Sequence, residues 1–237
     1  GQWTDDTSLA LCLGTSLVEK KGFDPFDQIE KYLAWFRTGY MSCTGNCFDI
    51  GNTTKAALLR YEENKEIYAG SPEDPATNGS LMRLAPIPLF YLNNLEETKH
   101  YARLSSKVTH APENCMNACS DLAVYIHRAL KGEDRESIFQ DAQFDFKKPY
   151  SEISGKGDAL VCFEGAMWCF YHSKNYDEGV RLAVNLGDDT DTTAAIFGQL
   201  AGAFYGVQGI SSKLLEDLWD KNLIEDLALK LFNSSAL

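Results

Sequence analysis

The chain has 237 residues, of which 44% are hydrophobic, and a formal net charge of −12 at pH 7. This length suits one domain with a sizeable core, and no apolar run approaches the length of a membrane span. The acidic balance argues against partners such as nucleic acid or anionic membranes, because both need a positively charged protein surface. Residues 1–6 show no signal-peptide pattern, so we expect a soluble, cytoplasmic monomer.

Helical periodicity begins directly after Thr4-Asp5-Asp6-Thr7, where leucines recur at every fourth position from Leu9 to Leu17. This pattern predicts a helix that ends before Pro25, and a similar spacing continues the helical pattern over residues 29–36.

Further apolar patterns predict most of the remaining elements. They indicate helices over residues 116–130, 163–171, 192–205 and 214–232, and an apolar stretch over 81–92 that Pro86 and Pro88 interrupt. Segments 43–54, 69–79 and 140–158 carry the Gly, Pro, Ser and Asn residues of ordered loops. Because strand signals are scarce, the sequence predicts a single all-α domain.

The seven cysteines include two pairs with a spacing of four residues, Cys43 with Cys47 and Cys115 with Cys119. If both stretches were helical, each pair would lie on one helix face and the four thiols could bind zinc. The spacing differs from the usual zinc knuckle, so buried free thiols in a reducing compartment are the preferred interpretation.

Two short segments concentrate carboxylate and hydroxyl oxygens at predicted helix starts, Thr4–Thr7 and Gly187-Asp188-Asp189-Thr190-Asp191-Thr192. Helix capping explains one aspartate at each start. Three aspartates in four residues repel one another, however, unless a cation lies between them. Since no His or Cys is close in sequence, the pattern favours magnesium, manganese or calcium over zinc, with capping as the alternative.

The helix after the second acidic segment has small residues along one side: Ala194, Ala195, Gly198, Ala201 and Gly202. This composition predicts a central helix that another backbone approaches closely. Its acidic start would then lie near that of the first helix, so that residues near 5 and near 190 meet around shared cations.

A rival interpretation rests on Asp189-Thr190-Asp191-Thr192-Thr193, which matches the Asp-x-Asp-x-Thr signature of haloacid-dehalogenase-type phosphatases. Val180–Leu186 would then be the buried strand that precedes the nucleophile. The motif lies too close to the C-terminus for the rest of such an α/β fold, which makes this the weaker alternative.

Five motifs in order resemble the ADP-ribosylglycohydrolase family, which includes the dinitrogenase-reductase-activating glycohydrolase. They cover nearly the whole chain: Trp3–Thr7, Phe48–Thr54, Asn78–Arg83, Thr109-His110 and Gly187–Thr192. The resemblance implies an orthogonal helical bundle with a dimetal cleft that holds two magnesium, or manganese, ions. Family members begin several dozen residues earlier, with a helix that carries a metal-binding glutamate, so we expect residues 1–237 to be this domain without its N-terminal helix.

The resemblance also implies roles for individual residues. The implied metal ligands are Thr4, Asp5 and Asp6 for one ion, Asp191 as a bridge, and Asp189 and Thr192 for the other. The implied ADP-ribose contacts are Asn78, Gly79, Ser80, Met82 and His110, with Asp49 near the ribose.

Three of these positions have plain structural alternatives. Arg83 would either pair with phosphate or form a buried ion pair. His110 could be a hydrogen-bonded structural histidine, and Asp49 could fix a turn before Gly51. No residue is assigned to adenine stacking, because Asp158 and Cys162 replace the aromatic residue and threonine usual in the family.

The implied reaction is hydrolysis of ADP-ribose from a modified protein side chain, with arginine as the expected acceptor. Asp5 or Asp6 would orient the attacking water while binding metal, and Asp49 would assist. Two alternatives stay open: an ADP-ribosyl-serine hydrolase, and a non-catalytic ADP-ribose binder or toxin-immunity protein on the same fold.

Overall fold

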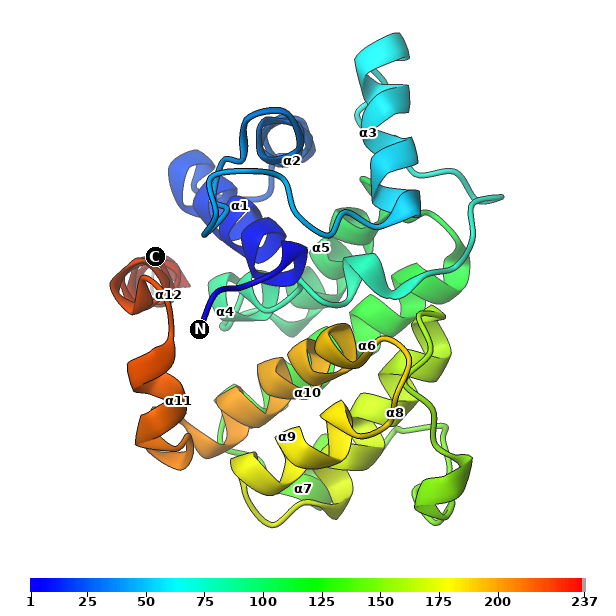
Figure 1. The fold of residues 1–237 in the computed structure, drawn as a ribbon, viewed down its shortest axis with the longest axis vertical. Coiled ribbons are helices and arrows are strands. Elements are labelled where there is room, and N and C mark those ends of the chain that lie inside the picture. The colour runs from blue at the N-terminus through cyan, green and yellow to red at the C-terminus, as the bar shows by residue number, and fades with distance from the viewer. Residues whose placement is uncertain (236–237) are drawn as a thin grey trace.

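The computed structural model describes residues 1–235, and its regular elements in this range are all helices, joined by loops (Figure 1). The only strand-like pairing in these residues is one isolated antiparallel bridge between Thr77 and Asp158. No helix in residues 1–235 combines the length and the apolar composition needed to cross a bilayer. The elements are α1 (Asp5–Lys20), α2 (Pro25–Thr38), α3 (Asn52–Asn64), η1 (Asn78–Ser80), α4 (Pro86–Phe90), α5 (Leu95–Lys107), α6 (Glu113–Leu130), α7 (Arg135–Ile138), η2 (Tyr150–Glu152), α8 (Ala159–His172), α9 (Tyr176–Val184), α10 (Thr190–Tyr205), η3 (Val207–Gly209), α11 (Ser212–Asp217) and α12 (Lys221–Ser235).

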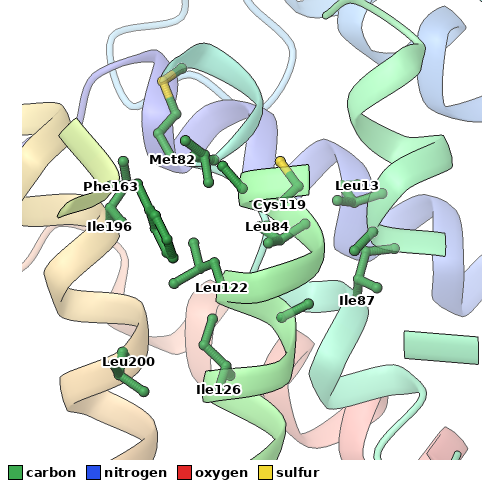
Figure 2. Packing of buried hydrophobic residues seen from close by; sticks show 14 of the residues in the cluster. Leu13, Met82, Leu84, Ile87, Cys119, Leu122, Ile126, Phe163, Ile196 and Leu200 are labelled. Carbon is green, nitrogen blue, oxygen red and sulfur yellow. The ribbon is translucent and has the colours of Figure 1, made fainter. Parts of the chain in front are cut away.

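The core is built around α6, which contacts α4, α5, α8 and α10. Figure 2 shows Leu122 and Ile126 of α6 directed toward Ile196 and Leu200 of α10, and all four side chains are at most 2% exposed. Each such buried leucine or isoleucine contributes roughly 1.5–3 kcal/mol of hydrophobic stabilisation. This packing fixes the position of α10, and with it the acidic segment at its start.

The long amphipathic helices predicted from periodicity are confirmed as α1, α2, α6, α8 and α10. Local signals set the ends of α2: Asp24 accepts a hydrogen bond from the Asp27 backbone N–H, and Pro25 is the first helical residue. Gly39 ends this helix in the left-handed region with φ of 73°.

The structure differs from the sequence prediction in several helices. α5 and α9, and most of α3, were not predicted, because many of their residues are polar or charged and no long apolar repeat marks them. The single helix predicted over 214–232 is two helices, since α11 ends at Asp217 and α12 begins at Lys221. The phosphatase alternative is excluded because α9 occupies residues 176–184, where that fold requires a strand.

The small residues of α10 do not act as predicted. A side-chain carbon built on Gly202 would meet no described atom within 4 Å, and one on Gly198 would meet only the Tyr176 hydroxyl, at 3.3 Å. The close backbone approach was therefore a wrong prediction at these glycines. α10 buries its larger residues instead, including Ile196, Phe197 and Leu200.

All seven cysteines are free thiols, as predicted, although Cys43 and Cys47 are only partly buried. The four-cysteine zinc alternative finds no support, because no three cysteine, histidine or acidic side chains of residues 1–235 are grouped closely enough to hold a metal ion. The Cys43 thiol contacts the backbone of Trp3, whereas the Cys119 thiol donates to the Ser80 hydroxyl.

Candidate active site

One cavity collects residues from all five sequence motifs. Its volume is about 340 Å³, within the range of small-ligand pockets. Helices α1, α3 and α10 all begin at it, and the short η1 turn forms part of its wall. The lining residues are Asp5, Asp49, Ile50, Gly51, Asn52, Thr53, Thr54, Thr77, Asn78, Gly79, Met82, His110, Gly157, Asp189, Asp191 and Thr192.

Most of the residues predicted for the site line this cavity, with three exceptions. Thr4 and Asp6 lie behind Asp5, and the Thr4 hydroxyl donates to Asp6 Oδ2 at 2.7 Å. Ser80 is 2% exposed, and its hydroxyl is hydrogen-bonded to the Ser106 hydroxyl at 2.9 Å rather than facing the cavity. The η1 turn thus directs the Ser80 side chain into the core, and the expected contact of this loop with ADP-ribose, through its glycine and backbone N–H groups, stays a prediction.

The two carboxylates at the start of α1 are almost fully buried, at 5% exposed for Asp5 and 4% for Asp6. Burial, followed by repulsion from Asp6, Asp49 and Asp191, raises the pKa of Asp5 to about 8. Burial also raises the pKa of Asp6 to about 6, although the Thr4 hydrogen bond opposes the shift. These buried carboxyl groups have no positively charged partner among the ion pairs of the described residues.

Helix capping does not explain the acidic residues here. Neither the α1 N-cap Thr4 nor the α10 N-cap Asp189 accepts a side-chain capping hydrogen bond. The Asp189 carboxylate instead accepts from Asn78 Nδ2 at 2.8 Å, which ties the start of α10 to the η1 turn. Desolvation and the neighbouring Asp189 carboxylate raise the pKa of Asp191.

The carboxylates meet the chemical requirements of a site for hard divalent cations. Their oxygens and two threonine hydroxyls form an all-oxygen donor set, and Asp6 Oδ1 is buried with no hydrogen-bond partner among the described residues. In residues 1–235, no group of three His, Cys, Asp or Glu side chains lies close enough together to coordinate one metal ion.

Asp49 occupies the exposed rim of the cavity. Its backbone lies in the left-handed region with φ of 60°, a conformation that aspartate tolerates better than most residues. Its carboxylate makes no hydrogen bond within the described part of the chain, so the turn-fixing alternative finds no support there.

The opposite wall contains His110 and, behind it, Arg83. Arg83 is 1% exposed and does not reach the cavity; its guanidinium lies 4.3 Å from the centre of the Tyr32 ring. Arg83 forms no ion pair with a carboxylate among the described residues, so the buried ion pair was a wrong prediction, and its position outside the cavity lining gives the phosphate contact no support. His110 is 1% exposed, lines the cavity and is hydrogen-bonded through both ring nitrogens.

Several lining residues were not nominated from the sequence. Thr53 and Thr54 belong to a recognised motif but were placed in a loop, whereas they form the first turn of α3 beside the cavity. Thr77 and Gly157 are held beside the cavity by two backbone pairings. One is the isolated bridge between Thr77 and Asp158, and the other is the hydrogen bond from Asn78 N to Gly157 O, at 3.1 Å. No sequence signal indicates this long-range pairing.

A larger cavity of about 860 Å³ lies between α9 and the segment 208–211. It contains none of the predicted site residues, so the smaller cavity is the candidate active site.

The fold and the site together define an all-helical protein whose acidic helix starts converge on one ligand-sized cavity. The profile of the ADP-ribosylglycohydrolase family matches residues 1–237. The chain therefore belongs to the ADP-ribosylglycohydrolase family, and it is a hydrolase of that family.

Named relatives give the same result. An ADP-ribosylarginine hydrolase, Tri1, from Pseudomonas putida (strain GB-1) is 36% identical over 98% of this chain and 67% of its own length. An ADP-ribosyl-[dinitrogen reductase] glycohydrolase from Rhodospirillum rubrum is 29% identical over 92% of this chain and 74% of its own length. A solved ADP-ribosylglycohydrolase-related protein complex superposes with a TM-score of 0.86, at 38% identity, covering 99% of this chain and 82% of that one.

Proposed function

We propose that this chain hydrolyses the bond between the anomeric carbon of ADP-ribose and an arginine side chain of a modified protein. The observation that carries the proposal is the cavity itself, where the buried Asp5 and the α10 carboxylates face the Asn78–Gly79 turn. The relatives named as ADP-ribosylarginine hydrolases support arginine as the acceptor. Carboxylates around the cavity also suit a guanidinium group.

We infer a dimetal cleft that holds two magnesium ions, with manganese as a substitute. The residues that would hold them are Thr4, Asp5, Asp6, Asp189, Asp191 and Thr192. The orphaned Asp6 Oδ1 and the mutual repulsion of the carboxylates support this assignment. When bound, the cations would neutralise these carboxylates and make water a competent nucleophile at neutral pH.

The reaction consumes one water molecule, breaks the bond from the anomeric carbon to the guanidino nitrogen, and returns a proton to that nitrogen. Asp5 is best placed to orient the water and accept its proton, because its side chain is the α1 carboxylate that lines the cavity. Asp6, which does not line the cavity, would act as a metal ligand. Asp49, on the exposed rim, would lie toward the ribose and the leaving group.

A release assay tests the proposal. Peptides carrying ADP-ribose on arginine or on serine are incubated with the chain in magnesium, and again after chelation of divalent cations. We expect free ADP-ribose from the arginine peptide only, and only with magnesium. Release from serine alone, or ADP-ribose binding without turnover, would replace the proposal with one of the two alternative functions.

A further inference from the structure

His110 is held rigidly in the cavity wall. Its backbone N–H donates to Ser106 O at 2.7 Å, and its carbonyl accepts from the Ser106 hydroxyl at 2.8 Å. Its ring lies between two threonines, with Nδ1 2.8 Å from Thr109 Oγ1 and Nε2 3.1 Å from Thr77 Oγ1. The tautomer of the ring decides which of these nitrogens donates a hydrogen bond.

Arg83 fixes the direction of hydrogen bonding at Nδ1. A guanidinium can only donate, so Thr109 Oγ1 accepts from Arg83 Nη2, at 2.6 Å. Thr109 is fully buried, and within the described residues the only acceptor near its hydroxyl hydrogen is His110 Nδ1. A proton on Nδ1 would leave that buried hydroxyl hydrogen without an acceptor, which is unfavourable.

The surroundings also keep the His110 ring neutral. Burial lowers the pKa of His110 to about 3, the Arg83 charge acts in the same direction, and Asp74 opposes it weakly. A neutral ring with an accepting Nδ1 carries its proton on Nε2. This proton points to Thr77, whose own hydroxyl donates onward to Thr53 Oγ1 at 3.1 Å.

We propose that Arg83 and Thr109 are positioning residues that hold His110 as its Nε2-protonated tautomer, so that the chain of hydrogen bonds ends at Thr53, whose hydroxyl lines the cavity and donates to an oxygen acceptor of the ligand. The hydrogen bonds then run in one direction, from the buried cation through Thr109 and His110 to Thr77 and Thr53. This also accounts for a buried arginine without a carboxylate partner. The identity of the ligand, ADP-ribose, rests on the proposed function, whereas the tautomer does not.

Long-range ¹H–¹⁵N spectra of the whole chain with labelled histidine test the tautomer directly. The chain has four histidines, and the H110N variant identifies the His110 signals. We expect Nε2 protonated and Nδ1 unprotonated in the wild type and in T109S, which keeps the hydroxyl. In T109V we expect a mixture of tautomers. A wild-type ring protonated on Nδ1, or a T109V spectrum identical to the wild type, would overturn the proposal.

Titration calorimetry with ADP-ribose and magnesium tests the consequence for binding. We expect T109V to bind about tenfold more weakly, which is ~1.4 kcal/mol, and T109S to bind as the wild type does. T98V is the matched control, because Thr98 is also fully buried with its hydroxyl oxygen 3.5 Å from a histidine Nδ1, that of His127, away from the cavity. Equal affinities of T109V and the wild type would refute the positioning role.

A wild type that binds no ADP-ribose would refute the proposed function instead. The spectra would still decide the tautomer in that case, since they are recorded on the free protein. R83M provides a second variant that removes the cation but leaves Thr109 in place, and its His110 spectrum should resemble that of T109V.

Discussion

Two groups of helix starts in this protein use polar residues differently. At α2, α5, α7, α8 and α9 the N-cap side chain accepts a hydrogen bond from the first turn, and these caps are Asp24, Asn94, Asp134, Asp158 and Asn175. At α1, α3 and α10, which all begin at the cavity, no N-cap side chain accepts such a bond. The first group uses its N-cap side chains to stabilise the helix, whereas in the second group the carboxylates of Asp5, Asp189 and Asp191 line the cavity.

Electrostatics separates the two groups further. The pKa of Asp134, a capping residue, is lowered by its hydrogen bonds to Ser137, so its charged form is favoured. The pKa values of Asp5 and Asp6 are raised, mainly by burial. A carboxylate with a raised pKa destabilises the folded chain at neutral pH, which indicates that α1 tolerates these residues for a reason other than stability.

The largest expected effect is the loss of activity in Asp5→Asn. This change removes the carboxylate that would accept the proton of the attacking water, and we expect hydrolysis of the arginine substrate to fall by about a hundredfold or more. A steady-state release assay measures it, with circular dichroism to confirm an intact fold. Activity within a fewfold of the wild type would show that the buried α1 carboxylate is not part of the catalytic machinery.

Gly79→Ala should have the next largest effect. An added methyl carbon would lie 3.0 Å from both Cε1 and Nε2 of His110, closer than ordinary packing allows. We expect ADP-ribose affinity to fall by about tenfold, on the order of 1–1.5 kcal/mol, measured by calorimetry. Gly202→Ala is the control, because its methyl would meet no described atom within 4 Å. It should bind normally and gain helix stability, by roughly 0.5–1 kcal/mol.

The sequence predicts more of the acidic side of the cavity than of the opposite wall, which contains His110. Residues near 5 and near 190 do converge, because each motif sits at a helix start and α10 is fixed by its core leucine and isoleucine. The direction of Ser80 depends on a single short turn, and the surroundings of Arg83 depend on Tyr32 from α2. These contacts join residues that are far apart in the chain, so no local sequence pattern predicts them.

The pH dependence of stability should show the next effect, of several degrees or more in the melting temperature. The pKa of Asp5 is near the ordinary aspartate value of 3.8 when the chain is unfolded and about 8 when it is folded, so the folded state binds more protons between these values. Stability conferred by this group therefore falls as the pH rises through this window. Without divalent cations, the melting temperature of Asp5→Asn relative to the wild type should increase from pH 5 to pH 8, by about 2–4 °C for each kcal/mol.

Magnesium sharpens the same measurement. It should raise the melting temperature of the wild type more at pH 8 than at pH 5, because cation binding favours ionised ligands. Asp5→Asn should show a much smaller magnesium effect at pH 8. Equal effects of magnesium on both proteins at both pH values would contradict the assignment of Asp5 as a ligand.

The smallest expected effect comes from the capped group and completes the comparison. Asn94→Ala removes the oxygen that accepts from the Glu97 backbone N–H at 3.1 Å, at the start of α5. Loss of such a cap costs about 1 kcal/mol, equivalent to about 2–4 °C in the melting temperature at this chain length. Calorimetric unfolding measures this loss. Release of ADP-ribose at 25 °C should be unchanged, because Asn94 does not line the active-site cavity. Cap variants would thus lose stability and keep activity, whereas Asp5→Asn would lose activity without losing stability. A loss of activity in Asn94→Ala without unfolding would remove the distinction between the two kinds of helix start.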